Sequence, residues 1–234
     1  MKNLRLILII WLFAITKGLS QDKGYVAISI GPSIPIGDFA SKDPDNDKAG
    51  LAQTGAIFDI SFCYKLGKQL GVSALLRGQA NSTDKQVIVN ELATQLPSGV
   101  TADVDTGYWS AGALMVGGYG SFPLSKKISF DSKIMFGLLT ASSPSFDINL
   151  NSGGGMGWVK QESVSSSAFA YLLGVGLKFD AGKRICLLAN VDYMGAKPKF
   201  ENVEIVGSDG TIQTTNWEQP YATINIGIGV GYRL

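Results

Sequence analysis

The last twelve residues of the chain, TINIGIGVGYRL, alternate strictly between large apolar side chains and small or polar ones. Alternate residues of an extended chain point to opposite faces, so a period of two predicts a β-strand. One face of this expected terminal strand is entirely apolar and consists of Ile224, Ile226, Ile228, Val230, Tyr232 and Leu234. The opposite face carries only Thr, Asn, Gly and Arg.

The same alternation recurs along the chain. Eight segments show it, at residues 26–36, 55–65, 72–79, 109–119, 128–138, 168–179, 184–193 and 223–234. Short connections at 67–69, 123–126 and 181–183 alternate with long ones at 38–53, 80–106, 141–165 and 197–219. An even number of antiparallel strands with short turns at one end and long loops at the other is typical of bacterial outer-membrane barrels. We therefore predict an all-β fold, an eight-stranded antiparallel up-and-down transmembrane β-barrel with short periplasmic turns and four long extracellular loops.

Size and charge decide which face of each strand is expected to meet lipid. The interior of an eight-stranded barrel is only just wide enough for side chains, so the large apolar residues are expected outside. In the fourth segment this assigns Trp109, Ala111, Ala113, Met115 and Tyr119 to the lipid face. Aromatic girdles are then expected from Tyr64, Tyr119, Phe130, Phe179 and Tyr232 at the short-turn end, and from Trp109, Phe169, Tyr171 and Tyr193 toward the long loops.

Residues 1–20 have the features of a secretory signal peptide. Lys2 and Arg5 precede the apolar run LILIIWLFAI, and Gly18-Leu19-Ser20 ends with small residues. Cleavage after Ser20 would leave residues 21–234 as one barrel domain, and an uncleaved anchor is the alternative. Because no later stretch is long and apolar enough for a membrane helix, a membrane protein of this sequence must cross as a barrel.

The sequence resembles the small outer-membrane β-barrel proteins of the OmpA/OmpX type. It resembles more closely the "outer membrane protein beta-barrel domain" family of Bacteroidetes. The matching stretches are GYVAISIGPSIPIGDF after the signal peptide and the terminal INIGIGVGYRL. The resemblance implies export to the outer membrane of a Gram-negative bacterium and insertion by the barrel-assembly machinery, which reads the terminal strand. Leu234 stands where that family usually has a final aromatic residue.

Charged residues that share a strand face with the small residues are expected to point into the barrel. They are Asp59, Arg77, Asp131, Lys133, Asp192 and Arg233, three acidic and three basic. Asp59 and Arg77 flank the first tight turn at similar distances, so they are expected to face each other across a hairpin. Because buried charges need partners, we expect an internal salt-bridge network, with a proton or ion path as the functional alternative.

Composition excludes several classes of function. The chain has no histidine, the usual general base of outer-membrane hydrolases, so we expect no enzymatic activity and no cofactor. A formal net charge of +1 argues against nucleic-acid binding. Export makes a disulfide between Cys63 and Cys186 conceivable, but the expected strands place them on nearly opposite walls, so we expect two buried thiols.

The long connections hold the remaining candidate sites. Asp43, Asp45 and Asp47 have the spacing of the first ligands of a calcium loop, but Lys48 and Thr54 stand where Gly and Glu are required, which favours a solvated acidic loop. In the second connection, Ile88, Leu92 and Leu96 recur at helical spacing and predict an amphipathic helix packed on the barrel mouth. Two alternating runs around residues 207–210 predict a projecting hairpin in the fourth connection.

Three functions fit these features. The first is a non-enzymatic outer-membrane barrel with a role in surface interaction or envelope integrity, and with partner contacts through loops 80–106 and 197–219. The second, implied by the PorT-like branch of the resembled family, is an accessory component of a secretion or assembly machine. The third is a soluble, exported, lipocalin-like barrel, which would place its apolar residues inside.

Overall fold

The computed structural model of the chain describes residues 24–152 and 155–234. The expected signal peptide lies outside the described residues. Within them, no helix is long and apolar enough to cross a membrane.

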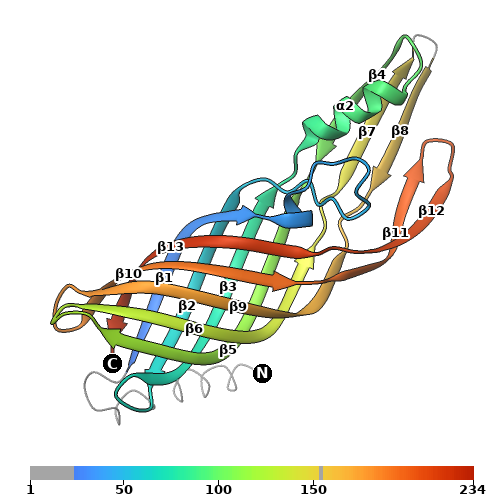
Figure 1. Ribbon diagram of the computed structural model, residues 1–234. Coiled ribbons are helices and arrows are strands. Elements are labelled where there is room, and N and C mark those ends of the chain that lie inside the picture. The colour runs from blue at the N-terminus through green and yellow to red at the C-terminus, as the bar shows by residue number, and fades with distance from the viewer. Residues whose placement is uncertain (1–23, 153–154) are drawn as a thin grey trace, which may run out of the picture.

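Eight antiparallel strands close into a barrel, as the alternation predicted, with the ring order β1-β13-β10-β9-β6-β5-β3-β2 (Figure 1). These strands are β1 (Gly24–Pro35), β2 (Gly55–Lys65), β3 (Leu70–Ser82), β5 (Tyr108–Pro123), β6 (Ile128–Ser142), β9 (Ser165–Asp180), β10 (Ile185–Ala196) and β13 (Tyr221–Arg233). The last strand pairs with the first from Tyr25 opposite Arg233 to Pro35 opposite Thr223. This pairing removes both sheet edges, so the predicted closure is confirmed.

Three tight turns and the C-terminus lie at one end of the barrel (Figure 1). Each turn is closed by a backbone N–H that donates to the carbonyl of the next strand: Leu66 to Leu70 at 2.9 Å, Leu124 to Ile128 at 2.8 Å and Ala181 to Ile185 at 3.1 Å. The predicted short connections are therefore confirmed. All four long connections leave the barrel at the opposite end.

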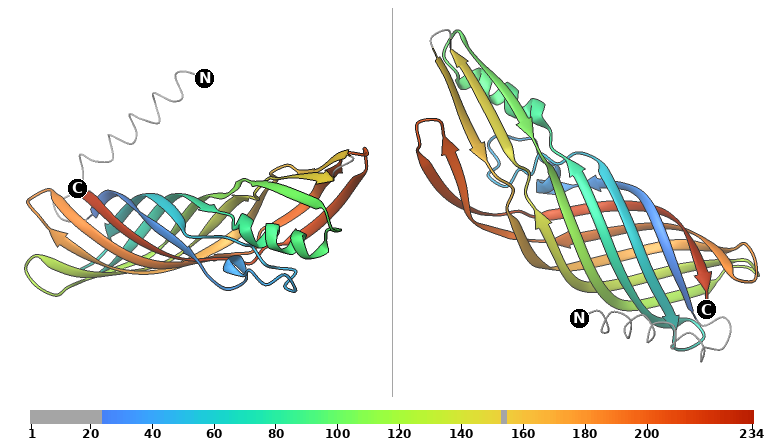
Figure 2. Two further views of the ribbon diagram at one scale, coloured as in Figure 1. Left: turned by 90° about the horizontal axis from the view of Figure 1, so that it is seen from above. Right: turned by 180° about the vertical axis from the view of Figure 1, so that it is seen from behind.

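The long connections build a second sheet that continues outward from the barrel mouth (Figures 1 and 2). We call this five-stranded sheet, of order β12-β11-β8-β7-β4, the loop sheet. Its strands are β4 (Val100–Thr106), β7 (Phe146–Ser152), β8 (Gly155–Gln161), β11 (Lys199–Gly207) and β12 (Ile212–Glu218). The hairpin of β11 and β12 confirms the prediction for the fourth connection. β8 pairs with β11 over residues 159–161 and 205–207. This pairing joins the third and fourth long connections, which the sequence pattern did not predict to be in contact.

The predicted helix is present as α2 (Lys85–Gln95), but it does not pack on the barrel mouth. It lies beside β4 at the side of the loop sheet (Figure 1). The carboxylate of Asp84 caps its first turn by accepting a hydrogen bond from the N–H of Gln86 at 3.2 Å. None of its side chains is fully buried, and Ile88 and Leu92 are only half-buried. The apolar side of the helix therefore packs against the neighbouring β4 and does not contact the barrel mouth.

Apolar side chains cover the outside of the barrel, as expected for seven of the eight strands. The assignment for β5 is wrong: Trp109, Met115 and Tyr119 face the lumen, whereas Leu114 and Val116 face outward. Opposite residues of an antiparallel pair share a face of the sheet. Met115 lies opposite the buried Leu75, so the register with β3 sets the orientation of the whole strand.

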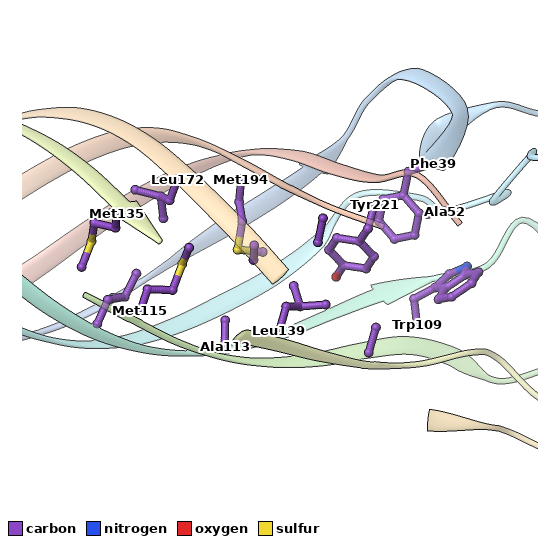
Figure 3. Packing of buried hydrophobic residues seen from close by; sticks show 14 of the residues in the cluster. Phe39, Ala52, Trp109, Ala113, Met115, Met135, Leu139, Leu172, Met194 and Tyr221 are labelled. Atoms are coloured by element: carbon purple, nitrogen blue, oxygen red, sulfur yellow. The ribbon is translucent and has the colours of Figure 1, made fainter. Parts of the chain in front are cut away.

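Large apolar residues fill the lumen from its middle to the mouth beside the loop sheet, where small or charged side chains were expected. Met115, Met135, Leu172 and Met194 lie deepest, and Phe39, Trp109 and Tyr221 close the mouth above them (Figure 3). Phe39 comes from the short helix η1 (Gly37–Ala40) in the first long connection. Its ring centroid lies 4.2 Å from that of Tyr221 and 5.4 Å from that of Trp109. We call this group the apolar plug.

Both cysteines are buried free thiols, so the prediction against a disulfide is confirmed. Cys63 lies 3.3 Å from the hydroxyl of Ser73, with Sγ and Oγ in hydrogen-bonding range. Cys186 belongs to the same buried cluster near the short-turn end but makes no bond to Cys63.

Candidate functional site

An ion-pair group of three residues crosses the middle of the lumen. Arg77 donates from Nε and Nη2 to the two carboxylate oxygens of Asp59, at 2.8 and 2.7 Å. It also donates from Nη1 and Nη2 to the carboxylate of Asp192, at 2.7 and 2.9 Å. Asn225 Nδ2 adds a hydrogen bond of 3.1 Å to Asp192 Oδ1. Arg77 thus makes a bidentate pair with each carboxylate, and charge-assisted pairs of this kind are stronger than hydrogen bonds between neutral groups.

Strand register explains how these residues meet. Asp59 lies directly opposite Arg77 in the β2–β3 hairpin, and Asp192 lies opposite Asn225 in the β10–β13 pair. In the ring order, β3 and β10 occupy opposite walls of the barrel. Arg77, only 1% exposed, therefore spans the lumen and links the two walls.

This arrangement suits a structural link better than proton transfer or catalysis. The carboxylates of Asp59 and Asp192 each accept two hydrogen bonds from Arg77. The guanidinium of an arginine does not lose its proton in proteins. A general base needs an unpaired acceptor within reach of a substrate, and these buried oxygens offer none.

The six inward charges do not form one network. Asp131 accepts hydrogen bonds through Oδ2 from the hydroxyls of Tyr119, at 2.8 Å, and Tyr25, at 3.5 Å. Arg233 pairs with Asp180 at 3.3 Å near the short-turn end. Lys133 faces the lumen from β6 but, among the described residues, forms no ion pair.

Lys178 is a further charged lumen residue, which the list of six expected inward charges does not contain. It is 6% exposed, and its ammonium lies over the ring of Tyr25, 5.3 Å from the centroid. The signal was present in the sequence, because Lys178 shares its parity with Gly174 and Gly176.

The acidic first loop is exposed and forms local turns. The N–H of Asp45 donates to Asp43 Oδ1 at 3.1 Å, and Asn46 Nδ2 donates to Asp38 Oδ1 at 3.2 Å. Asp47 is also exposed. Among residues 24–152 and 155–234, no group of three potential ligand side chains is arranged to hold a metal ion.

The terminal strand presents its apolar face outward along β13. Ile224, Ile226, Ile228, Val230 and Tyr232 are all exposed on the outer wall. Leu234, just beyond the strand, is half-buried, and its N–H donates to the carbonyl of Gly24 at 2.9 Å.

The two edges of the loop sheet differ in their protection. The edge strand β4 carries Asp103 and Asp105 and has α2 beside it. The other edge strand, β12, has its first five residues exposed, and its one charged residue, Glu218, is the last residue of the strand. Among the described residues, no strand pairs with the second edge of β12. Uncharged, exposed strand edges are sites at which another chain can add.

No protein-family model matches the sequence, and no curated protein matches it. Solved structures do resemble it. Ail, the attachment invasion locus protein of Yersinia pestis, is 16% identical, with 91% of this chain and 99% of Ail covered and a TM-score of 0.45. Neisserial surface protein A is 11% identical, with 92% and 100% covered and a TM-score of 0.42. A major outer membrane protein from Thermus thermophilus is 11% identical, with 90% and 99% covered and a TM-score of 0.49.

Proposed function

We propose that this chain is a non-enzymatic integral protein of a bacterial outer membrane, whose loop sheet offers the free edge of β12 to a protein partner outside the cell. The exposed apolar belt of the barrel supports the membrane assignment. Soluble monomers rarely expose continuous apolar patches larger than a few hundred Å². Here the exposed apolar residues occur on all eight barrel strands, from Val26 on β1 to Tyr232 on β13.

Outward-facing aromatic residues at both ends of the belt support the same assignment. Tyr64, Phe130, Phe179 and Tyr232 lie toward the short turns, and Tyr108, Phe169, Tyr171 and Tyr193 lie toward the loop sheet. Such girdles sit at the two membrane interfaces, so outer-membrane lipid is the expected surrounding. The terminal strand, residues 224–234, is then the segment that the barrel-assembly machinery would read during insertion.

The lumen argues for a role outside the barrel. Arg77 with its two carboxylates and the apolar plug occupy the lumen from its middle to the mouth beside the loop sheet, so we infer neither conduction nor catalysis. A lipocalin-like binding barrel would reverse this arrangement, with an apolar pocket inside and a polar exterior.

The observation that carries the proposed partner contact is the difference between β12 and β4. Proteins usually protect edge strands with charges, with proline or by covering them. The edge at β4 has charge and a neighbouring helix, and the edge at β12 has neither along residues 212–216. We infer that a strand of the partner pairs with the free edge of β12 in loop 197–219. Loop 80–106 lies at the opposite, protected edge of the loop sheet.

Site-specific photo-cross-linking on intact cells tests this proposal. A cross-linking amino acid at Gln213 of β12 is expected to give protein adducts, and one at Asp103 of β4 is not. Thr214→Lys places a charge on the free edge and should abolish the Gln213 adducts, whereas the matched Thr101→Lys on β4 should not. The absence of adducts at Gln213, or adducts that persist with Thr214→Lys, would contradict the proposed edge contact.

The same experiment separates the alternatives. Adducts with resident envelope proteins would favour an accessory component of a secretion or assembly machine over surface interaction. Membrane insertion is tested separately by fractionation and by migration on a denaturing gel with and without boiling. A soluble chain that does not shift on heating would overturn the membrane assignment and favour the lipocalin-like barrel.

A further inference from the structure

A groove of about 370 Å³ lies on one face of the loop sheet, over β8 and β11. Its lining consists of Trp158, Lys160, Glu162, Val164, Asn202, Glu204 and Val206. Val206 lies opposite Lys160 in the β8–β11 pair. The next step of the same antiparallel register places Glu204 opposite Glu162. Since β12 is the neighbour of β11, the groove lies beside the strand whose outer edge is free.

The two carboxylates of this groove, Glu162 and Glu204, lack a basic partner. The lysine of the groove, Lys160, pairs with Asp147 at 2.8 Å and lies over the ring of Trp158, 5.5 Å from its centroid. Among the described residues, neither glutamate forms an ion pair. Like charges directly opposite each other on neighbouring strands are destabilising. This part of the face therefore favours a cation supplied from outside the chain.

Thr214 on β12 connects the groove to the free edge. It lies opposite Glu204 in the β11–β12 pair, and the 61% exposed Ile212 lies opposite Val206. A strand added to β12 would place one residue opposite Thr214 on the same face, about 10 Å, or two strand spacings, from Glu204. The side chains of a lysine or arginine and of Glu204 together span that distance. The residue two positions along, opposite Ile212, would meet an apolar surface.

We propose that the partner strand that pairs with β12 carries a basic side chain, which reaches across Thr214 to Glu204 and Glu162. This inference rests on the proposed edge contact and adds the chemistry of its partner. Arginine suits two adjacent carboxylates because its guanidinium presents five donors in a planar fork. Acidic residues outnumber basic ones in the four long connections, so the outer end of the molecule attracts a basic partner. A second copy of this chain does not fit, because β12 itself carries no basic residue.

Photo-cross-linking from Gln213 on intact cells also tests this inference. Glu204→Gln and Glu162→Gln should each lower the yield of protein adducts by about threefold, the effect of losing one exposed ion pair, and the double variant by about tenfold. Glu162 follows β8, two strands from the free edge, so a loss there cannot come from the edge backbone. The matched control is Asp103→Asn on β4, which changes the net charge equally and should leave the yield unchanged.

Heat-dependent gel migration verifies that each variant is folded. If no adducts form at Gln213 in the otherwise unchanged chain, the proposed edge contact fails, and this inference fails with it. If adducts form and keep their yield in the Glu162 and Glu204 variants, the edge contact stands and this inference alone is overturned. An equal loss with Asp103→Asn would also overturn it, because binding would then depend on net charge and not on the groove. Adducts of twice the mass of the chain would identify a second copy and contradict a basic partner.

Discussion

Arg77 on β3 and Asp192 on β10 come from opposite walls of the barrel, yet the guanidinium Nη1 and the carboxylate Oδ1 lie 2.7 Å apart. The same guanidinium holds Asp59, its neighbour across the β2–β3 hairpin, at 2.7 Å. One side chain thus joins a local pair to a distant strand. The group acts across the ring, where no backbone hydrogen bond can reach.

Replacing Arg77 with leucine should strongly destabilise the barrel. The change leaves Asp59 and Asp192 buried without a cation, and breaking a buried pair in this way costs about 3–5 kcal/mol. Urea unfolding in lipid vesicles, followed by tryptophan fluorescence, measures the change in the free energy of unfolding. The matched control is Lys160→Leu, which removes the exposed pair with Asp147 at 2.8 Å and should change the stability little. Equal effects of the two changes would show that the lumen group does not stabilise the barrel.

Ile226→Arg should block insertion of the barrel into a bilayer. Ile226 points outward near the middle of β13, where an arginine that faces lipid costs about 2–4 kcal/mol. The fraction of chains that acquire heat-dependent gel migration in vesicles measures insertion. Ile212→Arg, on the exposed β12 of the loop sheet, is the control and should insert normally. Normal insertion of the Ile226 variant would contradict the lipid-facing assignment.

Trp109→Ala should open the apolar plug. Trp109 is 3% exposed, packs on Phe39 and donates from Nε1 to the carbonyl of Gly50 at 2.8 Å. Removal of a buried tryptophan side chain costs about 3–5 kcal/mol, and the same unfolding experiment detects it. The neighbouring Tyr108 faces outward, so Tyr108→Ala should have a much smaller effect. A larger effect at Tyr108 would mean that β5 has the opposite orientation.

The cap of α2 should respond to acid. The Lys42 ammonium, 2.5 Å from Asp84, lowers the pKa of the Asp84 carboxyl below its ordinary value of about 4. Because the folded-state pKa is depressed, the stabilisation is fully present above the unfolded-state pKa and is lost as the pH falls through the lower folded-state value. The amide shift of Gln86, which donates to Asp84, should therefore titrate with a midpoint below the ordinary carboxyl range. Asp84→Asn should remove this titration, and a midpoint at or above the ordinary range would contradict the ion pair.

The sequence by itself determined the number of barrel strands, the positions of the tight turns, the closure of the last strand on the first and the outward face of most strands. These features follow from local physics, because a period of two sorts side chains between two faces. The prediction that Asp59 lies opposite Arg77 also rested on local sequence, because both residues flank the same short turn. Hairpin register depends on the turn, and the turn is local in sequence.

Tertiary structure alone decided the orientation of β5, the apolar plug and the loop sheet. Both parities of β5 carry large apolar residues, such as Leu114 and Met115, so alternation cannot choose between them and the register with β3 does. The pairing of β8 with β11 and the contact of Arg77 with Asp192 join residues from distant segments. These residues come together only in the folded chain. Because they are far apart in the sequence, no local pattern predicts their contacts.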